Sequence, residues 1–172
     1  EQVGVRYKGN TSLGVSGPKK PLNLDLDAFV PGQKLWGYDV INLNNGWADP
    51  SQLREALAFS LLRETMPVPQ ASFAKVYAND SYVGLYLMME QIDKTFVERW
   101  FATRSGLIFK GDNPNDIMLE SSTLNYQSAL RAYKTGYELK TEEAGDDGYR
   151  LLQALTQVLD ASTAQGGVTD QD

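Results

Sequence analysis

One segment, residues 49–69, constrains the fold more than any other part of the chain. Asp49 is a residue type that caps helices, Pro50 suits the first helical position because its missing N–H would have no partner there, and Gln52 can complete a capping box. The prolines at the far end of the segment cannot continue a helix. We therefore predict a helix over residues 51–66.

This helix carries apolar residues on two opposite sides, so we expect neighbours to cover most of it. At about 100° per residue, one arc holds Leu53, Ala56, Leu57 and Leu61, and the other holds Phe59, Leu62 and Met66. Glu55 falls in the second arc, between Leu62 and Met66, where a carboxylate among apolar neighbours needs a partner. We therefore expect a cation beside Glu55.

Strand patterns flank the predicted helix. Leu22, Leu24 and Leu26 alternate with polar residues, so one face of this strand is expected in the core and the other in water. Strands are predicted over residues 3–8, 20–26 and 38–44 before the helix, and over 72–78 and 82–91 after it, with a hairpin turn at 79–81. The fold class is therefore predicted to be α+β, an antiparallel sheet with one packed helix.

The order of elements is that of a protein-kinase small lobe: two strands around a Gly-containing loop, a third strand, a helix, and two strands that lead to a hinge. Asp93 can cap a further short helix after the last of these strands. Beyond it we predict a strand over 107–110 and helices over 128–133 and 148–159. We accordingly expect one domain over 1–162, made of a small lobe (1–103) and a partial helical extension (104–162), and a flexible tail over 163–172.

Composition excludes several classes of function. The 172 residues include no Cys and no His, which excludes disulfides, thiolate nucleophiles, Ser-His-Asp triads and the usual zinc sites. The net charge of −6 argues against nucleic-acid binding, which needs a basic surface. No apolar run approaches the roughly 18 residues that a membrane span needs.

A series of short motifs resembles the CotH family, the kinase-like spore coat protein H group. The motifs are RYKGNTS at 6–12, KKPL at 19–22, VPGQKLWG at 30–37, NLNN at 42–45, LREALA at 53–58, PQASFA at 69–74, GLY at 84–86, EQIDK at 90–94 and FKGD at 109–112. No single motif is specific, but their order and spacing together are a specific signal. The resemblance covers about the first two thirds of the chain.

The resemblance implies an ATP-binding part of an atypical protein kinase that phosphorylates Ser on a protein substrate with Mg²⁺ or Mn²⁺. It also implies a place in the spore coat, at the cell surface or outside the cell. The family's catalytic and metal-binding Asp residues lie in stretches that we do not find before Asp172, so catalytic residues and metal ligands are expected outside this segment. The alternative is a pseudokinase that serves as a structural coat or surface-binding module.

The resemblance also suggests nucleotide-binding residues near the start of the chain. Gly9, Asn10 and Ser12 belong to a loop that could lie over phosphates, although an ordinary hairpin connection has the same composition. Lys20 is the expected phosphate-contacting lysine and Glu55 its partner, with Lys8 and Lys34 as rivals for Lys20. The alternative is a solvated Lys20 and a Glu55 that pairs with a neighbouring Arg.

The expected hinge follows the hairpin. Met89, Glu90 and Ile92 are the candidate adenine-binding residues, through main-chain hydrogen bonds and packing of methionine on the ring. The alternative is a buried edge strand with methionines in the core.

Because the catalytic carboxylates are expected outside this segment, we predict that this chain alone does not transfer phosphate. Incubation of the pure chain with labelled ATP, Mg²⁺ or Mn²⁺ and a casein-like substrate should leave both proteins unlabelled. Incorporation of label into either would contradict the prediction.

Overall fold

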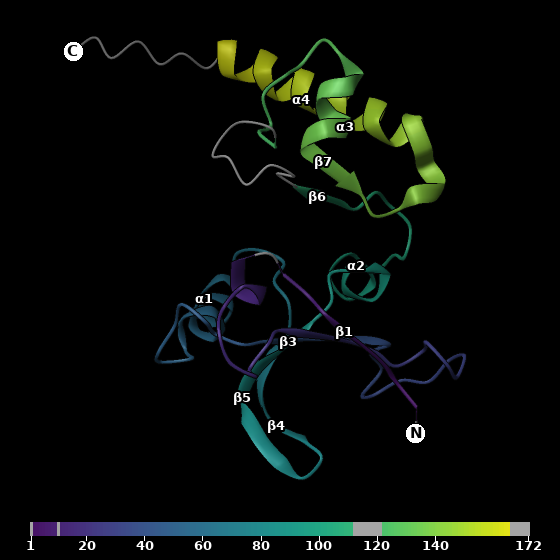
Figure 1. The fold of residues 1–172 in the computed structure, drawn as a ribbon. Coiled ribbons are helices and arrows are strands. Elements are labelled where there is room, and N and C mark those ends of the chain that lie inside the picture. Colours follow the sequence, from purple (N-terminus) through teal and green to yellow (C-terminus); the bar gives the residue numbers. More distant parts are fainter. Residues whose placement is uncertain (1, 10, 112–121, 166–172) are drawn as a thin grey trace, which may run out of the picture. The chain divides into compact units, whose positions relative to one another are not determined.

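The computed structural model describes residues 2–9, 11–111 and 122–165, and the chain divides into two compact units, Glu1–Arg104 and Ser105–Asp172. The first unit contains β1 (Gly4–Tyr7), β2 (Leu22–Asp25), β3 (Val40–Asn44), α1 (Arg54–Leu62), β4 (Ala71–Ala78), β5 (Ser81–Glu90) and α2 (Lys94–Phe101) (Figure 1). Its strands form one antiparallel sheet in the order β1-β2-β3-β5-β4. The predicted α+β class and antiparallel sheet are confirmed.

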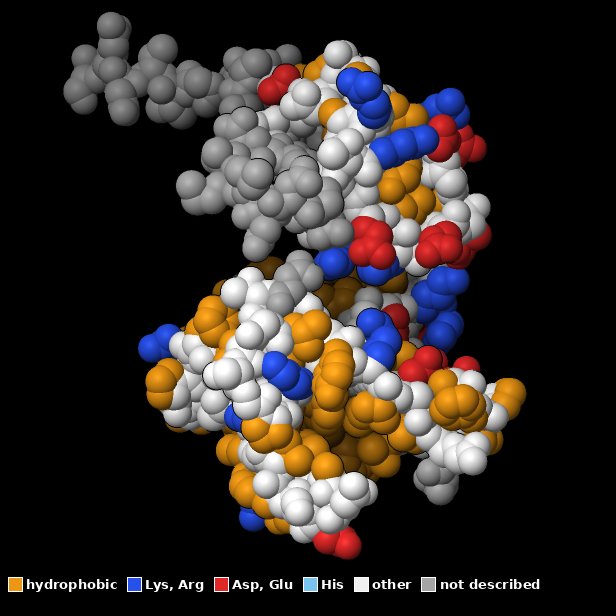
Figure 2. Space-filling model, in the orientation of Figure 1, with side chains coloured by type: hydrophobic (Ala, Val, Ile, Leu, Met, Phe, Trp, Pro, Cys, Tyr) orange, Lys and Arg blue, Asp and Glu red, His pale blue; other side chains and the backbone are white. Residues whose placement is uncertain are grey.

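The two faces of this sheet differ because polar and apolar residues alternate along the central strands. Leu24 lies opposite Ile41, and Leu22 lies opposite Leu43, which in turn faces Met88. Together with Tyr86 they belong to an apolar face that forms an open groove of about 820 Å³. Figure 2 shows hydrophobic side chains gathered in this hollow.

Helix α1 begins three residues later than the sequence predicts. Gln52 adopts a left-handed conformation (φ 58°), so residues 50–53 form a turn rather than the first helical turn. The Gln52 side chain donates hydrogen bonds to the carbonyls of Gly46 and Asp49 instead of completing a capping box. Asp49 still acts near the helix start, because its carboxylate accepts a hydrogen bond from the N–H of Arg54 at 2.8 Å.

The expected covering of α1 is wrong. Every residue of α1 is described and none is buried, and the Leu61 side chain is 77% exposed. Leu57 and Leu61 of the first arc are exposed, and so is Leu62 of the second, whereas Glu55, Ala56 and Phe59 are half-buried. The helix also ends at Leu62 rather than Met66.

The β4–β5 hairpin and α2 form as predicted. Asn79 and Asp80 both have positive φ, 47° and 65°, as a tight two-residue hairpin turn requires. The Asp93 carboxylate caps α2 by accepting hydrogen bonds from the N–H groups of Thr95 (2.7 Å) and Phe96 (3.2 Å).

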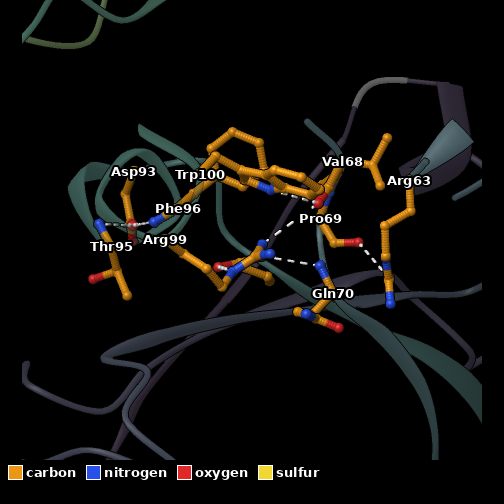
Figure 3. Close-up of polar contacts among 10 residues, drawn as sticks. Arg63, Val68, Pro69, Gln70, Asp93, Thr95, Phe96, Arg99 and Trp100 are labelled. Atoms are coloured by element: carbon orange, nitrogen blue, oxygen red, sulfur yellow. Dashed lines mark hydrogen bonds and ion pairs between the residues drawn. The ribbon is translucent and has the colours of Figure 1, made fainter. Parts of the chain in front are cut away.

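A buried ion pair attaches α2 to the end of the sheet. Glu90 is 4% exposed, and its carboxylate accepts hydrogen bonds from Arg99 and from the N–H of Gln70 (2.9 Å). Arg99 and Trp100 also donate to the Val68 carbonyl at 3.4 and 3.1 Å (Figure 3). One carboxylate thus joins α2, the end of β5 and the segment before β4.

The second unit contains β6 (Phe109–Gly111), α3 (Leu130–Gly136), β7 (Tyr137–Leu139) and α4 (Gly145–Gln165). β6 and β7 pair antiparallel, and Tyr133, Tyr137 and Leu152 form the buried cluster. The sequence predicts β6, α3 and α4 with shorter or shifted bounds but does not predict β7.

Across residues 2–9, 11–111 and 122–165, we find no helix whose length and apolar character would let it span a membrane.

Loss of the buried charge at Glu90 should destabilise the first unit. Glu90→Gln leaves Arg99 without its counter-charge, and breaking a buried pair costs about 3–5 kcal/mol. Urea unfolding followed by tryptophan fluorescence measures this unit, because all three Trp residues (36, 47 and 100) lie in it.

The matched control is Glu98→Gln. Glu98 pairs with Arg104 on the surface, where both side chains are half exposed, and such a pair contributes about 0–1 kcal/mol. Equal urea midpoints for Glu90→Gln and Glu98→Gln would contradict a structural role of the buried pair.

Candidate functional site

The sheet face opposite the apolar groove carries amide side chains. Asn23 of β2 lies opposite Asn42 of β3, and both are almost fully buried. Asn23 Nδ2 donates to Asn42 Oδ1 at 3.1 Å, and Asn42 Nδ2 donates to Gln91 Oε1 at 2.7 Å. These bonds form a row of amides from β2 to the end of β5, which satisfies the polar groups that the fold buries there.

A polar cavity of about 430 Å³ lies on this face where β1 and β3 end and α1 begins. Its lining residues are Lys8, Gly9, Ser12, Pro21, Asn44, Asn45, Gly46, Trp47, Ala48, Asp49, Arg54 and Glu55. The cavity therefore contains Gly9, Ser12 and Glu55 of the residues that the sequence nominated.

Lys8, Asn44 and Glu55 form a connected chain in the cavity. Lys8 Nζ donates to Asn44 Oδ1 at 2.9 Å, and Asn44 Nδ2 lies 3.0 Å from each Glu55 carboxylate oxygen. Burial lowers the pKa of Lys8, while the negative charge of Glu55 opposes that shift. The expected cation near Glu55 is thus Lys8, and the Asn44 amide stands between the two charges.

The loop after β1 brings Gly9 and Ser12 together. Gly9 has φ 79°, and a Cβ at this position would lie 2.5 Å from Ser12 Oγ, so both conformation and space favour glycine. Asn45, which is 5% exposed, donates to the carbonyls of Ser12 (3.2 Å) and Lys19 (3.0 Å). Asn10 lies outside the described residues.

Lys20 lies elsewhere. It lines the apolar groove on the other sheet face, and its ammonium donates to the carbonyls of Leu13 (3.0 Å) and Val15. The expected Lys20–Glu55 pair is therefore not formed, and the rival Lys34 pairs with Asp39 at 3.6 Å. Strand alternation could have favoured the rival Lys8 over Lys20, because two-residue steps from Arg6, which is opposite Asn23, place Lys8 on the amide face.

The expected hinge residues are divided between different environments. Met89 lies opposite Asn42, on the amide face. Glu90 donates its N–H to Gln70 O at 2.9 Å and its carboxylate is held by Arg99, whereas Ile92 is 47% exposed. β5 is an interior strand, so the edge position of the alternative is wrong, whereas its expectation of methionine in the core holds for Met88. A nucleotide-binding role of Met89, Glu90 and Ile92 stays a prediction.

Comparison with known proteins gives two findings. The family model described as CotH kinase protein matches residues 5–167. A relative described as inner spore coat protein H, from Bacillus subtilis (strain 168), is 28% identical over 123 residues, which are 71% of this chain. Those residues are 33% of that relative, so the chain spans about a third of its length.

The contacts of Glu55 predict that its charge stabilises the first unit. Glu55→Gln keeps the shape of the side chain but puts an amide nitrogen near the Asn44 amide and removes the counter-charge of Lys8. A hydrogen bond to a charged group is worth about 1.5–3 kcal/mol, and we expect a loss in that range in urea unfolding. Glu64→Gln, an exposed acid beyond α1, is the control. Coincident unfolding curves of the two variants would contradict the prediction.

Proposed function

Because this chain belongs to the CotH family, we propose that it is the ATP-binding part of a CotH-type atypical protein kinase, with the polyphosphate in the cavity at Lys8. The observation that carries the proposal is a half-buried ammonium in a polar cavity, with Glu55 held behind it by Asn44. Lysine binds phosphate as a point charge, and partial removal from water strengthens that attraction. Backbone N–H groups of Gly9 and Ser12 would bind the same oxygens.

The arrangement of elements supports a kinase-like small lobe. In protein kinases the phosphate-contacting lysine lies on the third strand and pairs with a glutamate of the helix that follows. Here Glu55 occupies the helix position, but the third strand presents Asn44 and the ammonium comes from Lys8 at the end of β1. The proposed site therefore contains the same two charged groups as a protein kinase, a lysine ammonium and a glutamate carboxylate, but the lysine comes from a different element.

The adenine would lie toward the end of β5. Met89 offers a polarisable side chain on the amide face, and Ile92 follows the strand where the main chain turns toward α2. The Glu90 carboxylate would support this segment through Arg99 rather than contact the base.

A divalent cation would need further carboxylates. Mg²⁺ and Mn²⁺ are bound through carboxylate and phosphate oxygens. In the part of the chain that the structure describes, no three acidic side chains are grouped to hold a metal ion. We propose that the metal ligands lie elsewhere in the protein, and we assign no step to the metal here.

The coat-module alternative rests on one finding. The Bacillus subtilis relative is described as an inner spore coat protein, which fits a chain that binds other coat proteins without transferring phosphate.

Nucleotide titration tests the proposed site. Calorimetry should detect ATP binding to the chain, and Lys8→Met should weaken it about tenfold or more, because a charged hydrogen bond is lost. Lys20→Met, which changes the opposite sheet face, should alter the affinity less than threefold. Absence of ATP binding, or a larger loss in Lys20→Met than in Lys8→Met, would contradict the proposed site.

Phosphotransfer by the full-length parent separates the enzyme from the coat module. The kinase proposal predicts incorporation of labelled phosphate into a Ser-containing protein, and loss of incorporation in Lys8→Met. A parent that binds ATP but labels no protein would favour the pseudokinase.

A further inference from the structure

We propose that Asn44 is a positioning residue, which sets the ammonium of Lys8 for an anionic ligand by standing between it and Glu55. The assignment of the anion as a polyphosphate rests on the proposed function, whereas the arrangement of the three side chains does not. The residues come from three separate elements, the end of β1, β3 and α1, and meet only through the Asn44 amide.

The orientation of this amide is fixed by its neighbours. A lysine ammonium can only donate and an ionised carboxylate can only accept. The Asn44 oxygen must therefore face Lys8, and its nitrogen must face Glu55. The structure has this orientation, with Oδ1 2.9 Å from Lys8 Nζ and Nδ2 3.0 Å from each Glu55 carboxylate oxygen. A flipped amide would put oxygen against oxygen and donor against donor.

The amide changes what Lys8 can offer to a ligand. An ammonium has three N–H donors, and Asn44 takes one of them, which leaves two for an anion. A direct Lys8–Glu55 pair would set the charges in contact, and the Coulomb attraction falls as their separation grows. With the amide between them, Glu55 holds the ammonium in place but compensates its charge less.

The position of Asn44 on the sheet makes this arrangement rigid. Asn44 is the last residue of β3 and lies opposite Leu87 of the interior strand β5. The next residue, Asn45, holds the carbonyl of Ser12 on the loop that lines the same cavity. Two consecutive asparagines thus position the cation and the loop beside it, and sites supported by strands are held more closely than sites on loops.

Opposite substitutions at Asn44 make the inference testable without a nucleotide. Asn44→Asp adds a negative charge next to the ammonium and should raise the pKa of Lys8, whereas Asn44→Ala removes the acceptor and should lower it further. The pKa is measured from the pH dependence of acetylation of Lys8 by acetic anhydride, followed by mass spectrometry. Asn42→Asp, two residues along the same strand, is the matched control and should move the Lys8 pKa less, because Asn42 contacts Asn23 and Gln91 instead.

Anion binding is measured on the same proteins with inorganic tripolyphosphate and with ATP. Asn44→Asp should weaken tripolyphosphate binding about tenfold or more, since it compensates the charge that attracts the anion, and circular dichroism checks that each variant is folded. If Asn44→Asp fails to fold, the Lys8 pKa in Asn44→Ala is the test. A lower pKa supports the positioning role, and an unchanged or higher pKa contradicts it.

The outcomes separate this inference from the proposed function. Unchanged Lys8 titration in both Asn44 variants, or a shifted titration with unchanged tripolyphosphate affinity, would overturn the positioning role. If tripolyphosphate binds in an Asn44-dependent way but ATP does not, the positioning role stands and the proposed function fails. If neither anion binds the wild-type chain, both are overturned.

Discussion

The register of β3 between β2 and β5 is the constraint on which the rest of the first unit depends. Ile41 and Leu43 point to one face, and Asn42 and Asn44 point to the other, so a shift of one residue would exchange the core with the polar face. The same register places Asn42 in the amide row and Asn44 beside Lys8 and Glu55. Packing and the candidate site are therefore fixed by one strand, and a substitution that disturbs its pairing should affect both.

Alternation and turn chemistry predicted the sheet because these signals are local. Leu22 and Leu24 mark the apolar face, and the Asp93 cap and the hairpin before it also formed where the sequence placed them. The start of α1 was missed because the left-handed turn at Gln52 is held by contacts with Gly46 and with Lys19, which is 33 residues away in the chain. The outward face of α1 was also missed, since an apolar arc in a sequence does not say what covers it.

Only some residues of the candidate site were predicted, because the contacts that form it also join segments that are far apart in the chain. Glu55 was identified from its place among apolar residues, and Gly9 and Ser12 from the loop, and all three line the cavity. Lys20 was chosen as the phosphate-contacting lysine of the strand predicted over residues 20–26, but the structure puts it on the sheet face opposite the cavity that Glu55 lines. Asn44 belongs to the NLNN motif at 42–45 but was assigned no role, because an asparagine at the end of a strand is common in turns and its bridging role needs partners from β1 and α1. The half-buried Asn44 amide keeps both charged groups hydrogen-bonded where they are partly removed from water.

The most direct test of the account is to ask which lysine meets the phosphates. Reductive methylation with ¹³C-formaldehyde labels the lysine ammonium groups and keeps their charge, and each gives an NMR signal that can be assigned by a Lys→Arg variant. We expect ATP and tripolyphosphate to shift the Lys8 signal and adenosine to leave it unchanged, while the Lys20 signal stays in place. A shift of Lys20 with an unmoved Lys8 would put the nucleotide on the apolar face and contradict the account.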